Sequence, residues 1–194
     1  MLDFELMKYC YGCGACVNAC PRSAIQMVQT TDGSCIPEID QAQCINCGKC
    51  DQVCIHQHTD RYHSILAGEG CYAAYELDKV ERKESASGGM FFLLAKEVLR
   101  QDGYVCGCVW NEKMDAVHIV SNKTIDIERM RNSKYVQSDI GRCLAEIREL
   151  LKIGKPVMFC GTPCQCTACQ AVTGNPENLL KVSLICEGTP TPGV

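Results

Sequence analysis

Apolar residues recur at helical spacing in the middle of the chain, where one side of a predicted helix over 140–153 carries Ile140, Leu144, Ile147 and Leu151. A second helix is predicted over 88–100. Short alternating or continuous apolar runs predict strands at 71–77, 104–110, 116–121, 156–160 and 180–186. Because strands alternate with helices, we expect an α/β layer fold from about residue 71 onward.

The first part of the chain has a different pattern. Apolar stretches at 24–28 and 35–39 predict two short strands, separated by the turn Thr31-Asp32-Gly33-Ser34. A segment this short buries little apolar surface, so bound groups must supply much of its stability. Residues 55–70 are polar and lack periodicity, which is typical of a linker.

Two cysteine runs with the same spacing lie in this first part, Cys10-x2-Cys13-x2-Cys16-x3-Cys20 and Cys44-x2-Cys47-x2-Cys50-x3-Cys54. This spacing is typical of bacterial two-cluster [4Fe–4S] proteins, in which the fourth cysteine of each run binds the other cluster. Glycines at 12, 14 and 48 let backbone N–H groups approach the sulfurs. We therefore predict crossed ligation, with one cluster on Cys10, Cys13, Cys16 and Cys54, and the other on Cys44, Cys47, Cys50 and Cys20.

Zinc and disulfides are the alternatives for these cysteines. A structural zinc site usually separates two Cys-x2-Cys pairs by a longer loop, so a third cysteine at the same short step argues against zinc. The segment resembles the two-cluster bacterial ferredoxin family, although Ile55 stands where Pro usually follows the last cysteine. We expect an α+β ferredoxin-like module over 1–60, a linker over 61–70 and an α/β domain over 71–194.

The composition of the chain indicates its cellular compartment and the class of its chemistry. The chain has 194 residues with 18 cysteines, a content that in a reducing compartment indicates metal binding or redox chemistry rather than disulfides. The opening residues have no basic, apolar leader and no stretch of 18 apolar residues follows, so we expect a cytoplasmic protein without a membrane span. The formal net charge of −4 and the lack of a Lys/Arg cluster argue against nucleic-acid binding.

Two motifs in the predicted α/β domain suggest ligand binding. Ser87-Gly88-Gly89 opens a predicted helix, where free N–H groups favour a phosphate, although a plain helix cap by Ser87 explains the motif as well. Gly161-Thr162-Pro163-Cys164 turns from a strand into a helix and places Cys164 at the helix start, a position that favours a metal ligand or a reactive thiolate. Cysteines 160, 164 and 186 follow strand ends and are expected to converge.

These motifs, together with Ser133-Lys134-Tyr135-Val136-Gln137-Ser138 and Ile185-Cys186-Glu187-Gly188, occur in an order that resembles the coenzyme F420 hydrogenase/dehydrogenase beta subunit family. Members are iron–sulfur flavoproteins, often fused to a two-cluster ferredoxin module. The resemblance implies FAD binding by Ser87, Gly88, Gly89, Lys134, Tyr135, Ser138, Gly161, Thr162 and Pro163. In some members it implies a third [4Fe–4S] cluster, for which Cys164 and Cys186 are the best-matched ligands.

The chain departs from this family in two places. Glu187 stands where the family usually has His or a similar residue, which can alter the flavin site. Family members also continue well past the strand predicted at 180–186, so the resemblance implies an α/β domain that is incomplete at its C-terminus.

The remaining cysteines can be explained by packing in the core rather than by cofactor binding. Cys106 and Cys108 share a face of their strand and could flank a cofactor, or simply pack as small buried residues. Packing is the favoured interpretation for Cys166 and Cys169, and for Cys35, Cys71 and Cys143.

These observations together predict an iron–sulfur flavoprotein oxidoreductase. It would transfer electrons between a hydride-carrying cofactor or substrate, F420-like, and one-electron carriers. Its partners would be a redox protein or a small-molecule hydride donor, within an oligomer or a larger complex. The alternatives are a ferredoxin-type electron-transfer protein without a substrate site, and a redox accessory protein of polysaccharide biosynthesis. The sequence assigns no catalytic residue.

Overall fold

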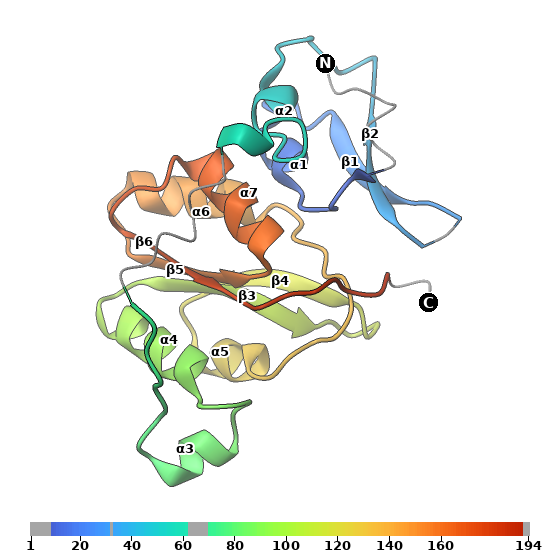
Figure 1. Cartoon of the computed structure of the whole chain (residues 1–194). Coiled ribbons are helices and arrows are strands. Elements are labelled where there is room, and N and C mark those ends of the chain that lie inside the picture. The colour runs from blue at the N-terminus through green and yellow to red at the C-terminus, as the bar shows by residue number, and fades with distance from the viewer. Residues whose placement is uncertain (1–8, 32, 62–69, 192–194) are drawn as a thin grey trace.

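The computed structural model describes residues 9–31, 33–61 and 70–191 (Figure 1). Its first part is a small module in which strand β1 (Ile25–Gln29) pairs antiparallel with β2 (Cys35–Ile39). Two short helices carry the cysteine runs, α1 (Ala15–Ala19) and α2 (Lys49–Gln52), and a 3₁₀ turn follows at Thr59–Arg61. Both strands predicted in this part are confirmed, the first with a shift of one residue.

The second part is built on a four-stranded sheet with the order β4-β3-β5-β6. Strands β3, β5 and β6 run parallel, and β4 pairs antiparallel with β3 at one edge. The strands are β3 (Tyr104–Trp110), β4 (Ala116–Ser121), β5 (Val157–Gly161) and β6 (Leu179–Ser183). The predictions for β3 and β4 are confirmed at both ends, whereas β6 ends before Cys186.

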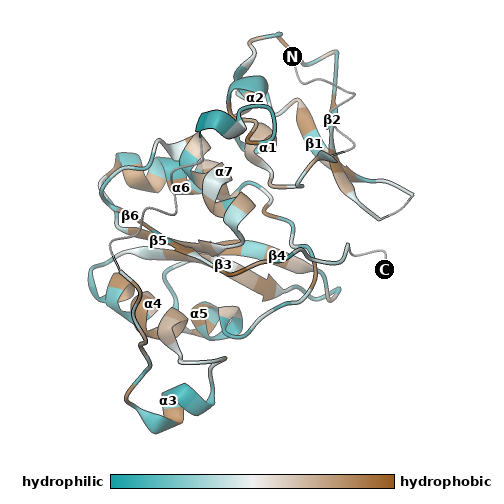
Figure 2. Cartoon of the chain, viewed as in Figure 1, coloured by the Kyte–Doolittle hydropathy of each residue, from teal (hydrophilic) through white to brown (hydrophobic). Residues whose placement is uncertain are grey.

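Helices cover both faces of this sheet, as the α/β pattern predicted (Figure 1). One face packs on α4 and α5, and the other on α6 and α7. These helices are α4 (Met90–Arg100), α5 (Thr124–Met130), α6 (Cys143–Lys152) and α7 (Pro163–Thr173). Figure 2 shows the central strands mainly in the hydrophobic colour, and β5 is buried along its whole length. Cys143, Cys166 and Cys169 are buried in the core, as their packing interpretation predicted.

The prediction of a strand over 71–77 is wrong. This segment pairs with no described strand and leads into a short helix, α3 (Lys79–Lys83). Its apolar side chains are exposed, with Tyr72 at 86% and Leu77 at 80%, so their alternation does not reflect a buried sheet face. Cys71 is exposed too, which contradicts the packing expected for it. Helix α5 was not predicted, because its seven residues give too short a pattern.

The small module sits on the side of the sheet that α6 and α7 cover (Figure 1). Helix α1 contacts both of these helices. The backbone carbonyl of Tyr11 accepts a hydrogen bond from Gln137 Nε2 at 3.2 Å, and that of Val17 accepts one from Arg142 at 2.6 Å. The first cysteine run is therefore anchored to the α/β part. None of the described helices is long and apolar enough to cross a membrane.

Candidate iron-sulfur centres and an adjoining cavity

One group of four cysteines encloses a small pocket in the outer part of the small module. The pocket, of about 50 Å³, is lined by Cys20, Cys44, Cys47 and Cys50. Burial raises the pKa of Cys50, and the Cys20 thiol adds to the rise. The backbone N–H of Ala24 donates to Cys20 Sγ at 3.3 Å, the kind of bond that supports a cluster-bound thiolate. Cys20 thus lies with three cysteines of the second run, as crossed ligation requires.

The other group lies where the small module meets the α/β part. Burial raises the pKa of Cys16, and with smaller contributions from the neighbouring thiols of Cys10 and Cys54 this pKa reaches about 12. Burial and Cys54 also raise the pKa of Cys10, whose Sγ accepts an N–H bond from Gly12 at 3.4 Å. Burial disfavours the thiolate form of these cysteines when no metal is bound. The positive charge of cluster iron would allow Cys10, Cys13, Cys16 and Cys54 to bind as thiolates.

Left-handed backbone turns shape both groups. Gly14 and Gly48 precede α1 and α2 with φ values of 70° and 73°. Gly12 and Asn46 hold equivalent places within the runs, with φ values of 63° and 52°. Such turns direct N–H groups inward, which suits a cubane of sulfide and thiolate. The donor set and the backbone therefore fit two [4Fe–4S] clusters.

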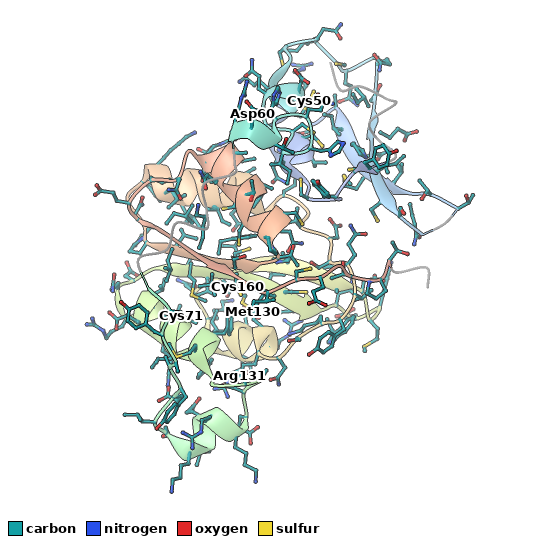
Figure 3. The ribbon with its side chains drawn as sticks, in the orientation of Figure 1. Cys50, Asp60, Cys71, Met130, Arg131 and Cys160 are labelled. Atoms are coloured by element: carbon teal, nitrogen blue, oxygen red, sulfur yellow. The ribbon has the colours of Figure 1, made fainter. Side chains whose placement is uncertain are left out.

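A cavity of about 290 Å³ opens beside the first group, at the carboxyl ends of the parallel strands. The pairing of β3 with β5 stops at Cys106 and Phe159, and the cavity begins where the strands part. Figure 3 labels Cys160 and Met130, two lining residues that come from the sheet and from α5. This edge of an open α/β sheet is the usual place for a ligand.

The start of α4 lines the cavity through Ser87 and Gly89. Gly89 is the N-cap of α4, with φ of 76° and no side-chain cap among the described residues. Ser87 adopts φ of 54° in the preceding turn and does not cap the helix, which corrects the plain-cap interpretation. The first N–H groups of α4 therefore stay available to an anion at the cavity edge. Gly88 lies outside the lining.

Arg131 brings a positive charge to the same cavity. It pairs with Glu81 of α3, and its guanidinium lies 3.4 Å from the centre of the Phe92 ring. Its Nε is buried and has no hydrogen-bond partner in the part of the chain that the structure describes. Arg131 was not predicted as a site residue, because it follows α5, the helix that the sequence analysis missed.

Lys134 lines the cavity as the family resemblance implied, but its donors are already engaged. Its Nζ donates to three backbone carbonyls near the end of α5, those of Arg129 at 3.0 Å, Arg131 at 2.7 Å and Asn132 at 3.1 Å. Burial lowers its pKa. Lys134 therefore contributes charge and loop geometry rather than a free N–H. Tyr135 lies outside the lining and is 84% exposed.

The Gly161-Thr162-Pro163 turn and Ser138 are joined by one buried side chain. Gln165 donates from Nε2 to Ser138 Oγ at 3.0 Å, and its Oε1 accepts the Thr162 N–H at 3.0 Å. Thr162 begins α7, with Pro163 in its first position as predicted. Ser138, Gly161 and Thr162 line the cavity, and Pro163 lies outside it.

His118 of β4 is a lining residue that the sequence did not suggest. Its ring stacks on Phe159 with centroids 5.8 Å apart, and Nε2 lies 3.2 Å from the Cys160 carbonyl oxygen. Burial lowers its pKa to about 4, so the ring is neutral at neutral pH. Nδ1 is buried and lacks a partner among the described residues. A polar residue on an otherwise apolar strand face was the available signal.

Cys164 connects the cavity with the first group of cysteines. It lines the cavity, and Thr162 Oγ1 lies 3.1 Å from its Sγ. Burial raises the pKa of Cys13, with further contributions from Cys16 and then Cys164, so the two sites are neighbours. Tyr11 and Gly12 of the first run also line the cavity.

The other cysteines divide between cavity and core. Cys108 and Cys160 line the cavity, whereas Cys106 is buried in the core. Cys186 lies outside the lining, next to the fully exposed Ile185. Among the described residues, no three His, Cys, Asp or Glu side chains group as a single metal ion requires. The third cluster stays a prediction.

In a comparison with protein families, residues 9–57 match the 4Fe-4S dicluster domain. The match covers both cysteine runs and supports a ferredoxin-type module that binds [4Fe–4S] clusters and transfers electrons. A comparison of the chain with curated proteins finds no match.

Proposed function

We propose that this protein transfers electrons between FAD, bound in the cavity, and two [4Fe–4S] clusters. It would act as an oxidoreductase between a hydride-carrying cofactor or substrate, F420-like, and one-electron carriers. One observation carries the proposal: the first cysteine run and the motifs shared with flavoproteins line the same cavity. A bound flavin would therefore lie next to the cluster of Cys10, Cys13, Cys16 and Cys54.

The cavity residues suit a flavin. The volume of about 290 Å³ lies just below the usual range for small-molecule sites, roughly 300–1,000 Å³, so the cavity would enclose the ring system with the rest of the cofactor extending outward. Phe91 and Met130 form an apolar part of the cavity wall. His118 Nδ1 and Arg131 Nε are buried without a hydrogen-bond partner among the described residues, so a ligand could supply one. When bound, a flavin accepts two electrons together and releases them singly.

The residues of the chain would bind the cofactor and exclude water. Arg131 and the uncapped start of α4 offer positive charge and N–H donors to a diphosphate. A Cβ at Gly161 would lie 2.8 Å from Gln165 Oε1, so glycine leaves room for the side chain that holds this turn of the cavity wall in place. Tyr11 and Gly12 lie between Cys10 and Cys13 in the chain and line the cavity, so they would place the first cluster against the cavity wall.

The second cluster would be suited to exchanging electrons with a partner protein. Cys47 is exposed, as is the neighbouring Ile45 at 59%. Electrons would pass from the cavity to the first cluster, then to the second, and from there to a partner protein. The reverse direction uses the same path.

FAD titration of the anaerobically reconstituted protein tests this function. We expect one FAD per chain, and Arg131→Gln should weaken FAD binding roughly tenfold through the lost charge-assisted contact. Riboflavin, which lacks phosphate, should bind both forms alike. Arg129→Gln is the matched control, because Arg129 lies two residues before Arg131, in the last turn of α5, but outside the cavity lining. A protein that takes up iron but no FAD would contradict the proposal, as would an equal loss of riboflavin binding.

A further inference from the structure

Asn18 is a polar side chain buried at the contact between the small module and the α/β part. It is 1% exposed, and every polar atom of its amide is paired. Nδ2 donates to the carbonyls of Gly14 and Gly141, both at 2.9 Å. Oδ1 accepts the backbone N–H of Ala145 at 3.0 Å. One amide therefore joins α1 to the start of α6.

The bond to Ala145 has the form of a helix cap supplied from another part of the chain. Arg142 is the N-cap of α6 and makes no side-chain cap bond within the described residues. Ala145 is the third residue of the helix, and its N–H also donates to the Arg142 carbonyl at 3.1 Å. Asparagine caps a helix by accepting an N–H of the second or third residue. Asn18 makes that bond to α6 from α1.

Two neighbouring contacts make the fit close. Arg142 donates back to the carbonyl of Val17 at 2.6 Å, so each element satisfies a terminal group of the other. A Cβ on Gly14 would lie 2.3 Å from Ile140 Cγ2, which leaves no room for a side chain. The start of α1 therefore packs closely against the segment that leads into α6.

We infer that Asn18 is a positioning residue for electron transfer, because it holds the first cluster in register with the cavity by capping α6. On the cluster side, Asn18 lies two residues from Cys16 in α1. On the cavity side, α6 follows the segment of Gln137 and Ser138, which line the cavity. The inference rests on the proposed function in one respect, that the cavity holds the electron-transferring ligand.

The duplicated run supplies a matched control. Gln52 occupies in the second run the place that Asn18 has in the first. Gln52 is exposed, and α2 has no buried residue. Replacing each residue by Leu removes an amide of similar size from equivalent cluster helices, but only one of the two reaches α6.

Hydrogen–deuterium exchange of the cluster-loaded protein tests the cap without any flavin. In Asn18→Leu we expect the amides at the start of α6 to exchange roughly fivefold to tenfold faster than in the wild type, with iron content retained. Asn18→Asp keeps an acceptor for Ala145 and loses the two amide donors, so its exchange should be intermediate. Gln52→Leu should exchange like the wild type. Unchanged exchange in Asn18→Leu overturns the inference.

Flash photoreduction of FAD in the loaded protein tests the role in electron transfer. Bleaching of cluster absorbance should follow several-fold more slowly in Asn18→Leu, at equal iron and FAD content, and at the wild-type rate in Gln52→Leu. An unchanged rate in Asn18→Leu overturns the inference. If Asn18→Leu fails to assemble clusters, Asn18→Asp is compared in its place. If no variant binds FAD, the proposed function fails, and the exchange measurement alone decides whether Asn18 caps α6.

Discussion

The two cysteine runs share their spacing but not their surroundings. Both begin a short helix after a glycine with a left-handed backbone, Gly14 or Gly48. The helix of the first run buries Ala15, Val17 and Asn18, and packs on α6 and α7. The helix of the second run buries none of its residues.

The residues between the cysteines account for this difference. At equivalent places, the first run has Ala15, Val17 and Asn18, and the second has Lys49, Asp51 and Gln52. Cysteine spacing therefore specifies a cluster in each run, whereas the intervening side chains specify what each cluster faces. The first run adjoins the cavity, whereas the second includes the exposed Cys47, which is the arrangement that the proposed function needs.

The largest expected effect comes from replacing the fourth cysteine of each run, Cys20 or Cys54, by Ser. Crossed ligation assigns Cys20 to the outer cluster and Cys54 to the inner one, so each Ser variant should lose one cluster and fall from about eight irons to about four. The two variants should differ in which cluster remains, as judged by iron analysis and electron paramagnetic resonance. Stoichiometric zinc in the wild type, or loss by Cys20→Ser of the cavity-side cluster alone, contradicts the assignment.

Swapping side chains between the runs should have the next largest effect. Ala15→Lys places an unpaired charge in a site that is 1% exposed, and should destabilise the protein by about 3–5 kcal/mol. Lys49→Ala, on the exposed helix, should change the free energy of unfolding by less than about 0.5 kcal/mol. Anaerobic urea unfolding of the cluster-loaded variants measures both. Similar losses for the two variants would show that the runs do not differ in burial.

The paired glycines give a smaller effect. Alanine at either Gly14 or Gly48 incurs the left-handed backbone cost of about 1–2 kcal/mol. Alanine at 14 also overlaps Ile140, whereas a Cβ at 48 meets no described atom within 4 Å. Gly14→Ala should therefore lose about 1–3 kcal/mol more than Gly48→Ala. Thermal unfolding under anaerobic conditions compares them, and equal losses argue against close packing of the first run.

The smallest effect concerns His118, in the cavity wall beside the first run. Folding lowers its pKa from 6.5 to about 4, so the folded protein favours the neutral ring. Between these values the unfolded chain takes up a proton that the folded protein does not, and stability falls as the pH is lowered. His118→Gln should remove about 1 kcal/mol of the loss between pH 7 and 5.5. Urea unfolding at both pH values measures it, and equal pH dependence of the two proteins would place the ring in solvent.

Much of the fold and part of the site were predictable from the sequence. The apolar runs at 104–110 and 116–121 predicted the first and last residues of β3 and β4. The cysteine spacing predicted that Cys20 shares a pocket with Cys44, Cys47 and Cys50. The strand expected at 71–77 failed because alternation alone cannot tell an exposed segment from a sheet edge. Asn18 and Arg131 were missed because their partners are distant in the chain, and Ala145 follows Asn18 by 127 positions. Long-range pairing of this kind leaves no local pattern.

The central claim is that the first cluster connects the cavity with the second. Flash reduction of FAD in the loaded protein, compared between Cys20→Ser and Cys54→Ser, tests it most directly. We predict that cluster absorbance still bleaches at the wild-type initial rate in Cys20→Ser, which retains the cavity-side cluster, and that this fast phase is absent in Cys54→Ser. Fast bleaching in Cys54→Ser together with its loss in Cys20→Ser would contradict the account.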